Sequence, residues 1–74
     1  MPKLPQLSGK QILKILEKQG FELDHQTGSH LILRQTEEPH RRITVPNHNP
    51  VSIGTLNAII KQSGLSREDF LKKR

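Results

Sequence analysis

Hydrophobic residues change their spacing twice along the chain, and these changes mark the elements that the sequence predicts. Apolar side chains recur at intervals of three and four residues over 8–20 and again over 52–64, which is typical of helices with one buried side. Between these stretches, apolar and polar positions alternate, which is typical of strands. The residues expected on the buried sides are Ile12, Leu13, Ile15 and Leu16 in the first helix and Ile53, Leu56, Ile59 and Ile60 in the second.

Serines mark the expected helix starts. Each of Ser8, Ser52 and Ser66 follows an apolar residue and precedes another by four positions, the pattern of a serine N-cap closed by a hydrophobic staple. Ser8 and Ser66 also have a glutamine or an aspartate three residues later, as in a capping box. Gly20 and Gly64 are expected to end the first two helices. The third helix, "SREDFLKK", is short and is expected only to cover an edge.

The alternating stretches 21–24, 30–34 and 42–45 predict three strands, each with one apolar face. "HQTG" is expected to form a tight first turn with Gly28 at positive φ, and "TEEPH" a looser second turn. Pro46 and Pro50 enclose the loop "PNHNP" after the third strand. The inward residues are Phe21, Leu23, Leu31, Leu33, Ile43 and Val45, and the residues assigned to the open face are His30, Arg34, Arg42 and Thr44. A register shift of one residue would reverse this assignment.

The order of elements is therefore α-β-β-β-α with a short C-terminal helix, an α+β fold. Helices are expected to cover one face of a three-stranded antiparallel sheet and to leave the other open. A chain of 74 residues suffices for one small domain, so residues 1–74 are expected to form a single domain. The sequence has no apolar run long enough to cross a bilayer, no leader-like N-terminus and no cysteine, which favours a cytoplasmic protein without a membrane partner.

Charge narrows the class of partner. The net charge of +5 and a pI near 10.1 favour an anionic partner, most often nucleic acid, over a merely basic surface. Two phenylalanines and no tyrosine or tryptophan can hardly supply the aromatic platforms that read single strands by stacking. Contact with RNA through backbone charge and shape, as in proteins that bind double strands, is therefore expected. Lys10, Lys14 and Lys18 line one side of the first helix, either as a solvated face or as phosphate contacts.

Four histidines are the remaining chemical groups, at 25, 30, 40 and 48. Their scattered positions lack the spacing of metal ligands, and no cysteine nucleophile or phosphate-binding glycine loop is present. General acid–base cleavage of RNA stays open, because RNA supplies its own nucleophile, the 2′-OH, and histidine exchanges protons near neutral pH. A surface histidine is nevertheless more often a bystander than a catalyst.

Four stretches of the chain carry a more specific signal: "SGKQILKILEKQGF", "GSHLIL", "RRITVPNHN" and "IGTLNAIIKQSGLSREDFL". In this order and spacing they resemble the HicA mRNA interferase toxins of prokaryotic toxin–antitoxin modules. The resemblance implies a fold like that of double-stranded-RNA-binding domains, ribosome-independent cleavage of mRNA, and a cognate HicB-like antitoxin that masks the active site. The acid–base chemistry calls for no metal and no other cofactor. The family's essential residue is the histidine of its Gly-Ser-His motif, which is His30 here.

The remaining predicted site residues are His48 and Ser29 as accessory groups and Lys10, Lys14, Arg34 and Arg42 as contacts to RNA. Two positions differ from the family's usual pattern. Leu31 follows His30 where the family often has a second histidine, and Asn47 precedes His48 where a basic residue or histidine is common. Two alternatives to an endoribonuclease stay open: a module that binds RNA without cutting it, and a protein whose surface meets only its antitoxin.

Overall fold

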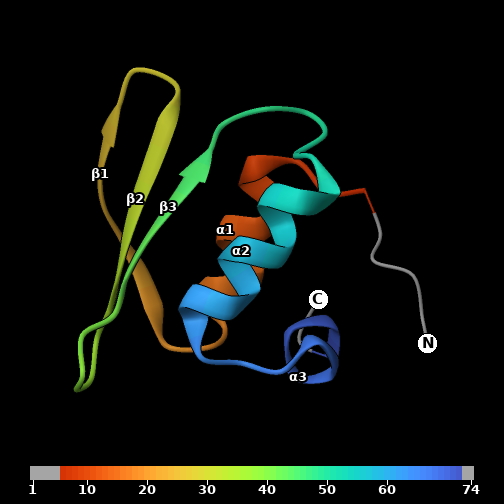
Figure 1. Ribbon diagram of the computed structural model, residues 1–74. Helices are drawn as coiled ribbons and strands as arrows, with labels where there is room; N and C mark the ends of the chain where they lie inside the picture. Colours follow the sequence, from red (N-terminus) through yellow and green to blue (C-terminus); the bar gives the residue numbers. More distant parts are fainter. Residues whose placement is uncertain (1–5, 73–74) are drawn as a thin grey trace.

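A three-stranded sheet with helices on one face forms the structure, a computed structural model that describes residues 6–72. Figure 1 shows the two layers edge-on, with α1 and α2 beside the sheet and α3 below them. This confirms the predicted α-β-β-β-α order with a short C-terminal helix. The elements are α1 (Gly9–Glu17), β1 (Phe21–Thr27), β2 (His30–Gln35), β3 (Arg42–Pro46), α2 (Ile53–Ser63) and α3 (Arg67–Lys72). Residues 1–5, where no leader is expected, and residues 73–74, which include the last residue of the predicted third helix, lie outside the described residues.

The predicted serine caps are present, and at Ser66 the backbone N–H of Asp69 donates to Oγ at 3.0 Å. The first helix ends earlier than predicted, at Glu17 with Lys18 as its C-cap, and Gly20 follows with a positive φ of 94°. The backbone N–H of Gln11 donates to Ser8 Oγ at 3.2 Å, and the Ser8 N–H donates to Gln11 Oε1 at 2.8 Å, which completes a capping box. Ser52 accepts from the N–H of Thr55 at 3.3 Å. Gly64 closes α2 with a φ of 77°, a left-handed conformation that side chains rarely adopt. The hydrogen bonds therefore set each helix start where the serines predict it.

The sheet has the order β1-β2-β3, and both pairs are antiparallel. β1 is longer than predicted and continues to Thr27, so that only Gly28 and Ser29 form the first turn. Gly28 has the expected positive φ, at 50°. A bulge between Leu23 and His25 adds one residue to β1, which the alternation alone did not indicate.

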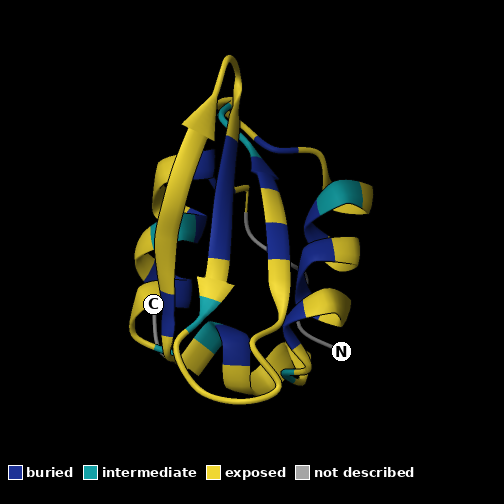
Figure 2. Cartoon of the chain, turned by 90° about the vertical axis from the view of Figure 1, so that its left-hand side faces the viewer, coloured by how far each residue is buried: buried dark blue, intermediate teal, exposed yellow. Residues whose placement is uncertain are grey.

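Apolar side chains from both layers meet in one core. Figure 2 looks onto the open face of the sheet and shows buried positions concentrated on β2 and alternating along β3. α3 contributes more than edge cover, because Phe70 is completely buried. The core residues are Leu7, Ile12, Ile15, Leu16, Phe21, Leu31, Leu33, Ile43, Val45, Val51, Leu56, Ile59, Ile60 and Phe70.

Two residues predicted to be buried are exposed. Leu23 and Ile53 each keep 41% of their surface in contact with solvent. Leu23 is paired with the core residue Leu33 on β2, but β1 is an edge strand and has no strand on its other side. Leu23 also lies next to the bulge. Ile53 is the first residue of α2 and therefore lies at the N-terminal end of that helix. In both cases the residue follows the correct period, but the covering layer does not reach it.

None of the helices within residues 6–72 is long and apolar enough to span a membrane.

Candidate functional site

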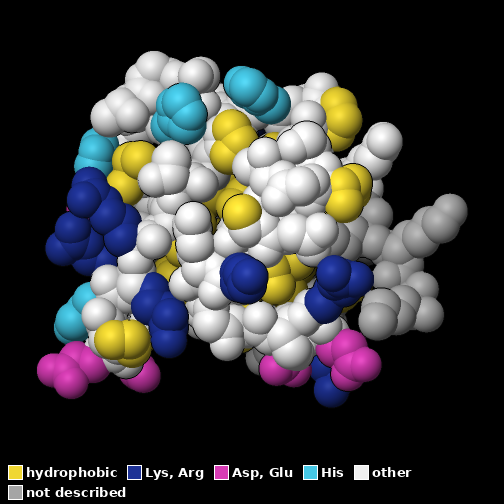
Figure 3. All heavy atoms as spheres, in the orientation of Figure 1, with side chains coloured by type: hydrophobic (Ala, Val, Ile, Leu, Met, Phe, Trp, Pro, Cys, Tyr) yellow, Lys and Arg dark blue, Asp and Glu magenta, His cyan; other side chains and the backbone are white. Residues whose placement is uncertain are grey.

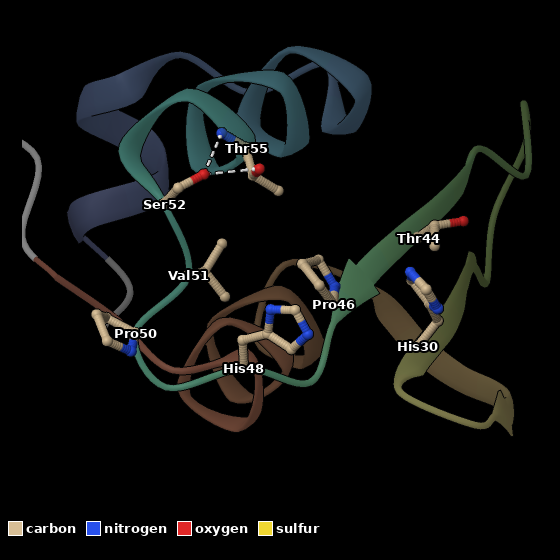
Figure 4. A pocket seen from close by; sticks show the side chains of 8 residues that line it. All are labelled: His30, Thr44, Pro46, His48, Pro50, Val51, Ser52 and Thr55. Carbon is tan, nitrogen blue, oxygen red and sulfur yellow. Dashed lines mark hydrogen bonds between the residues drawn. The ribbon is translucent and has the colours of Figure 1, made fainter.

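One open pocket, of about 460 Å³, collects side chains from β2, β3, the loop after β3 and the first turn of α2. His30 and His48, which lie far apart in the sequence, both line it. Figure 4 shows the His48 ring close to Val51 and Pro46, with the His30 ring beyond Pro46 beside Thr44. The lining residues are His30, Thr44, Pro46, His48, Pro50, Val51, Ser52 and Thr55.

The position of His30 is set by the hairpin. It is the first residue of β2, directly after the Gly28–Ser29 turn, and it is paired with Thr27 on one side and Pro46 on the other. Its neighbour Leu31 points into the core, so His30 is exposed on the opposite face. The buried leucine thus fixes the register that presents the imidazole to solvent.

The loop that carries His48 is held by its main chain. Asn47 N–H donates to Ser29 O at 2.6 Å, Gly9 N–H donates to His48 O at 2.9 Å, and Val51 N–H donates to Leu7 O at 2.7 Å. These bonds tie the loop to the hairpin turn and to the start of α1. Ser29, predicted as an accessory group, therefore acts on the loop through its carbonyl.

Gly9 allows this close approach. A Cβ at this position would overlap Pro46 O and lie 2.9 Å from Asn47 Cα. Because α1 begins at Gly9, the start of the helix and the His48 loop meet backbone to backbone. The contact fixes where the loop crosses the rim of the sheet.

The imidazoles of His30 and His48 have no hydrogen-bond partner within residues 6–72. By contrast, His25 Nδ1 lies 3.0 Å from Asp24 Oδ2, and His40 Nδ1 lies 3.2 Å from the carbonyl oxygen of Gln35. Main-chain hydrogen bonds order the loop that carries His48, without a bond from its imidazole. Both pocket imidazoles therefore keep their ring nitrogens available for a ligand.

The pocket suits an anion. None of its lining residues is an aspartate or a glutamate, and the first turn of α2 has no acidic residue either. Ser52 donates its hydroxyl to Thr55 Oγ1 at 2.8 Å, so these two hydroxyls organise the start of the helix that forms one wall. The positive end of the helix dipole lies at this wall. Ser52 was predicted as a helix cap, whereas no sequence signal pointed to Thr55 as part of the site.

The residues predicted to contact RNA lie on two different surfaces. Arg34 and Arg42 are exposed on the open face of the sheet and are paired across β2 and β3. Lys10 and Lys14 are exposed on α1, which covers the other face. Figure 3 shows histidine side chains along the upper edge of the molecule with lysines and arginines below them, and another histidine side chain at the lower left beside acidic side chains. The pocket thus adjoins the arginine surface through β2.

Within the part of the chain that the structure describes, no three His, Cys, Asp or Glu side chains lie close enough together to hold a metal ion. The histidines at 25 and 40 are outside the pocket lining.

The fold and the pocket define a class of protein: a small, basic α+β structure with two histidines in an acid-free pocket at the rim of its sheet. The family model described as "HicA toxin of bacterial toxin-antitoxin" matches residues 9–65 of the 74-residue chain. The chain therefore belongs to the HicA toxin family of bacterial toxin–antitoxin systems. A comparison with the sequences of curated proteins finds no significant match.

Proposed function

We propose that this toxin is a metal-independent endoribonuclease that cleaves mRNA and thereby inhibits translation. The observation that carries the proposal is the pair of imidazoles, from His30 and His48, in one pocket without carboxylates. Such a pocket accepts a phosphate and offers two groups that can exchange protons near neutral pH.

The proposed chemistry needs one proton removed and one supplied. One imidazole takes the proton of the ribose 2′-OH, and the 2′-oxygen then attacks the adjacent phosphorus. The bond from phosphorus to the 5′-oxygen breaks, and the other imidazole, in its protonated form, donates a proton to this leaving oxygen. The products are a 2′,3′-cyclic phosphate and a 5′-OH. His30 is the catalytic residue carried by the family motif. His48 supplies the second proton-transfer group, since Leu31 stands where the family often has a second histidine and cannot transfer a proton.

The wall of the pocket at α2 supports the same chemistry. Negative charge on the phosphate increases as the new bond forms, and the N-terminal end of a helix stabilises such charge. Ser52 and Thr55 belong to this end of α2. The proposed partners are mRNA as substrate and a HicB-like antitoxin that covers the pocket, with the cytoplasm as the place of action.

The test compares cleavage of a synthetic RNA by the wild type, His30→Ala and His48→Ala, with and without EDTA. Loss of one acid–base group costs on the order of 10²–10⁴ in rate, so His30→Ala is expected to be nearly inactive. His48→Ala is expected to lose activity as well, and EDTA is expected to have no effect on the wild type. The matched control is His40→Asn, outside the pocket, since asparagine tolerates the positive φ of 57° found there.

Equal cleavage by wild type and His30→Ala would refute the proposed mechanism, and loss of cleavage in EDTA would point to a metal. The alternative function, RNA binding without cleavage, predicts a different pattern. In that case the wild type binds RNA and yields no product with a cyclic phosphate end.

A further inference from the structure

We propose that Arg34 and Arg42 form a second phosphate site, so that a single RNA strand runs along β2 from the histidine pocket to this arginine pair. The proposal rests on the proposed function for the identity of the ligand, RNA. It adds the path that the RNA strand takes across the molecule. It also places the lysines of α1 outside the surface that binds this strand.

The register brings the two guanidinium groups together. Arg34 on β2 is the cross-strand partner of Arg42 on β3, and both are exposed. Within residues 6–72 neither guanidinium has a hydrogen-bond or ion-pair partner. The ion pair found in this part of the chain is between His25 and Asp24. Like charges directly opposite each other in a sheet are unfavourable, and an anion held between them removes the repulsion. The planar arginine fork matches the oxygens of a phosphate.

The same strand connects this pair to the pocket. His30 and Arg34 lie on the same face of β2, four residues apart, which corresponds to about 13 Å along an extended strand. Ile32 lies between them and is only 8% exposed, so the neighbouring side chains cover it. Its cross-strand partners are the polar residues His25 and Thr44.

Carboxylates border the path on the side of β1. Glu22 is the partner of Arg34 on β1, and Asp24 lies at the bulge. Phosphates are repelled by these groups and attracted by the arginines of β2 and β3, so the strand is expected to lie over β2 and β3. Lys14 lies on α1, on the other side of the sheet, and cannot contact the same stretch of RNA.

The chemistry of the pocket favours one strand over a duplex. Attack by a 2′-oxygen requires it to lie in line with the bond that breaks, and the stacked A-form duplex holds it away from that line. Phe21 and Phe70 are both buried, and the chain has no tyrosine or tryptophan, so the open face holds phosphates and does not stack bases on aromatic rings. Binding at this site should therefore depend strongly on salt and weakly on sequence.

The experiment uses a short, fluorescently labelled 2′-O-methyl RNA oligonucleotide of mixed sequence, which binds but cannot be cleaved because it has no free 2′-OH. Fluorescence anisotropy over a series of salt concentrations gives the affinity and its salt dependence. Arg34→Gln and Arg42→Gln are each expected to weaken binding roughly tenfold and to reduce the slope of log affinity against log salt by about 0.7. Lys14→Gln, which removes the same charge from α1, is the matched control and should change both much less.

Glu22→Gln tests the acidic border in the opposite direction. It is expected to strengthen binding by roughly two- to threefold, because one repulsive charge beside Arg34 is removed. Wild-type affinity in both arginine variants, or an equal loss in Lys14→Gln, would overturn the proposed site, and weaker binding by Glu22→Gln would contradict the border. Because the probe is not cleaved, these results do not depend on catalysis by His30. A wild type that binds through the arginines but cuts no RNA would refute the nuclease and leave the second phosphate site standing.

Discussion

At the scale of single residues, Gly9 and Gly54 differ in whether the structure leaves room for a side chain. Gly9 begins α1 where the backbone of Pro46 and Asn47 leaves no room for a side chain. Gly54, in the first turn of α2, has no atom within 4 Å of the position of a Cβ. The first glycine is therefore required by the loop that carries His48, and the second is open to substitution.

Alanine at these two positions should change stability in opposite directions. Gly9→Ala is expected to lower the free energy of unfolding by about 1–3 kcal/mol, since the loop must move to admit the methyl group. Gly54→Ala is expected to raise it by up to about 1 kcal/mol, because alanine is the better helix former. Urea denaturation measures both changes. A Gly9→Ala protein as stable as the wild type would mean that the loop does not lie against α1.

At the scale of elements, α3 is the helix whose role changes most between sequence and structure. Its pattern predicts a short cover for an edge, yet Phe70 is completely buried in the common core. Polar contacts tie the helix to both neighbours: Gln19 Nε2 donates to the carbonyl oxygen of Asp69 at 3.0 Å, and Arg67 Nη2 donates to Asn57 Oδ1 at 3.1 Å. One aromatic side chain thus makes a helix of six residues part of the core.

Phe70→Ala is expected to cost about 3–5 kcal/mol, because it empties a site with no solvent access. In a small protein this is a large share of the total stability, so Phe70→Leu should be measured beside it as a milder variant. Lys72→Ala, exposed on the same helix, is the control and should stay within about 0.5 kcal/mol of the wild type. Thermal unfolding gives all three values. An unaltered midpoint for Phe70→Ala would show that α3 is not docked.

At the scale of the whole molecule, β2 connects the core with the proposed functional surface. It is the central strand, and Leu31, Ile32 and Leu33 are all buried in it. The same strand begins with His30 and carries Arg34 on its open face. One strand therefore carries both stability, through its three buried residues, and the proposed function, through His30 and Arg34 on either side of them.

This arrangement predicts a gradient of protection in amide hydrogen exchange. The amides of Leu31 and Leu33 should exchange most slowly, because opening a central strand requires most of the fold to open. Outward-facing amides of β1, an edge strand with a bulge, should exchange much faster. Exchange followed by NMR provides the comparison. Equal rates in β1 and β2 would contradict a sheet stabilised from its centre.

The sequence by itself determined the elements and their caps, because serine N-caps, closing glycines and hydrophobic periods act over a few residues. It also placed His30 and Arg34 on the open face, since alternation along β2 needs no distant contact. Only the tertiary structure decided that His48 lines the same pocket as His30, because main-chain bonds to Ser29, Leu7 and Gly9 tie that loop to the hairpin turn and to the start of α1. It also decided that Leu23 stays exposed and that the lysines of α1 face away from the arginines. These outcomes depend on how distant parts of the chain pack against one another, and local hydrophobic periodicity does not specify such packing.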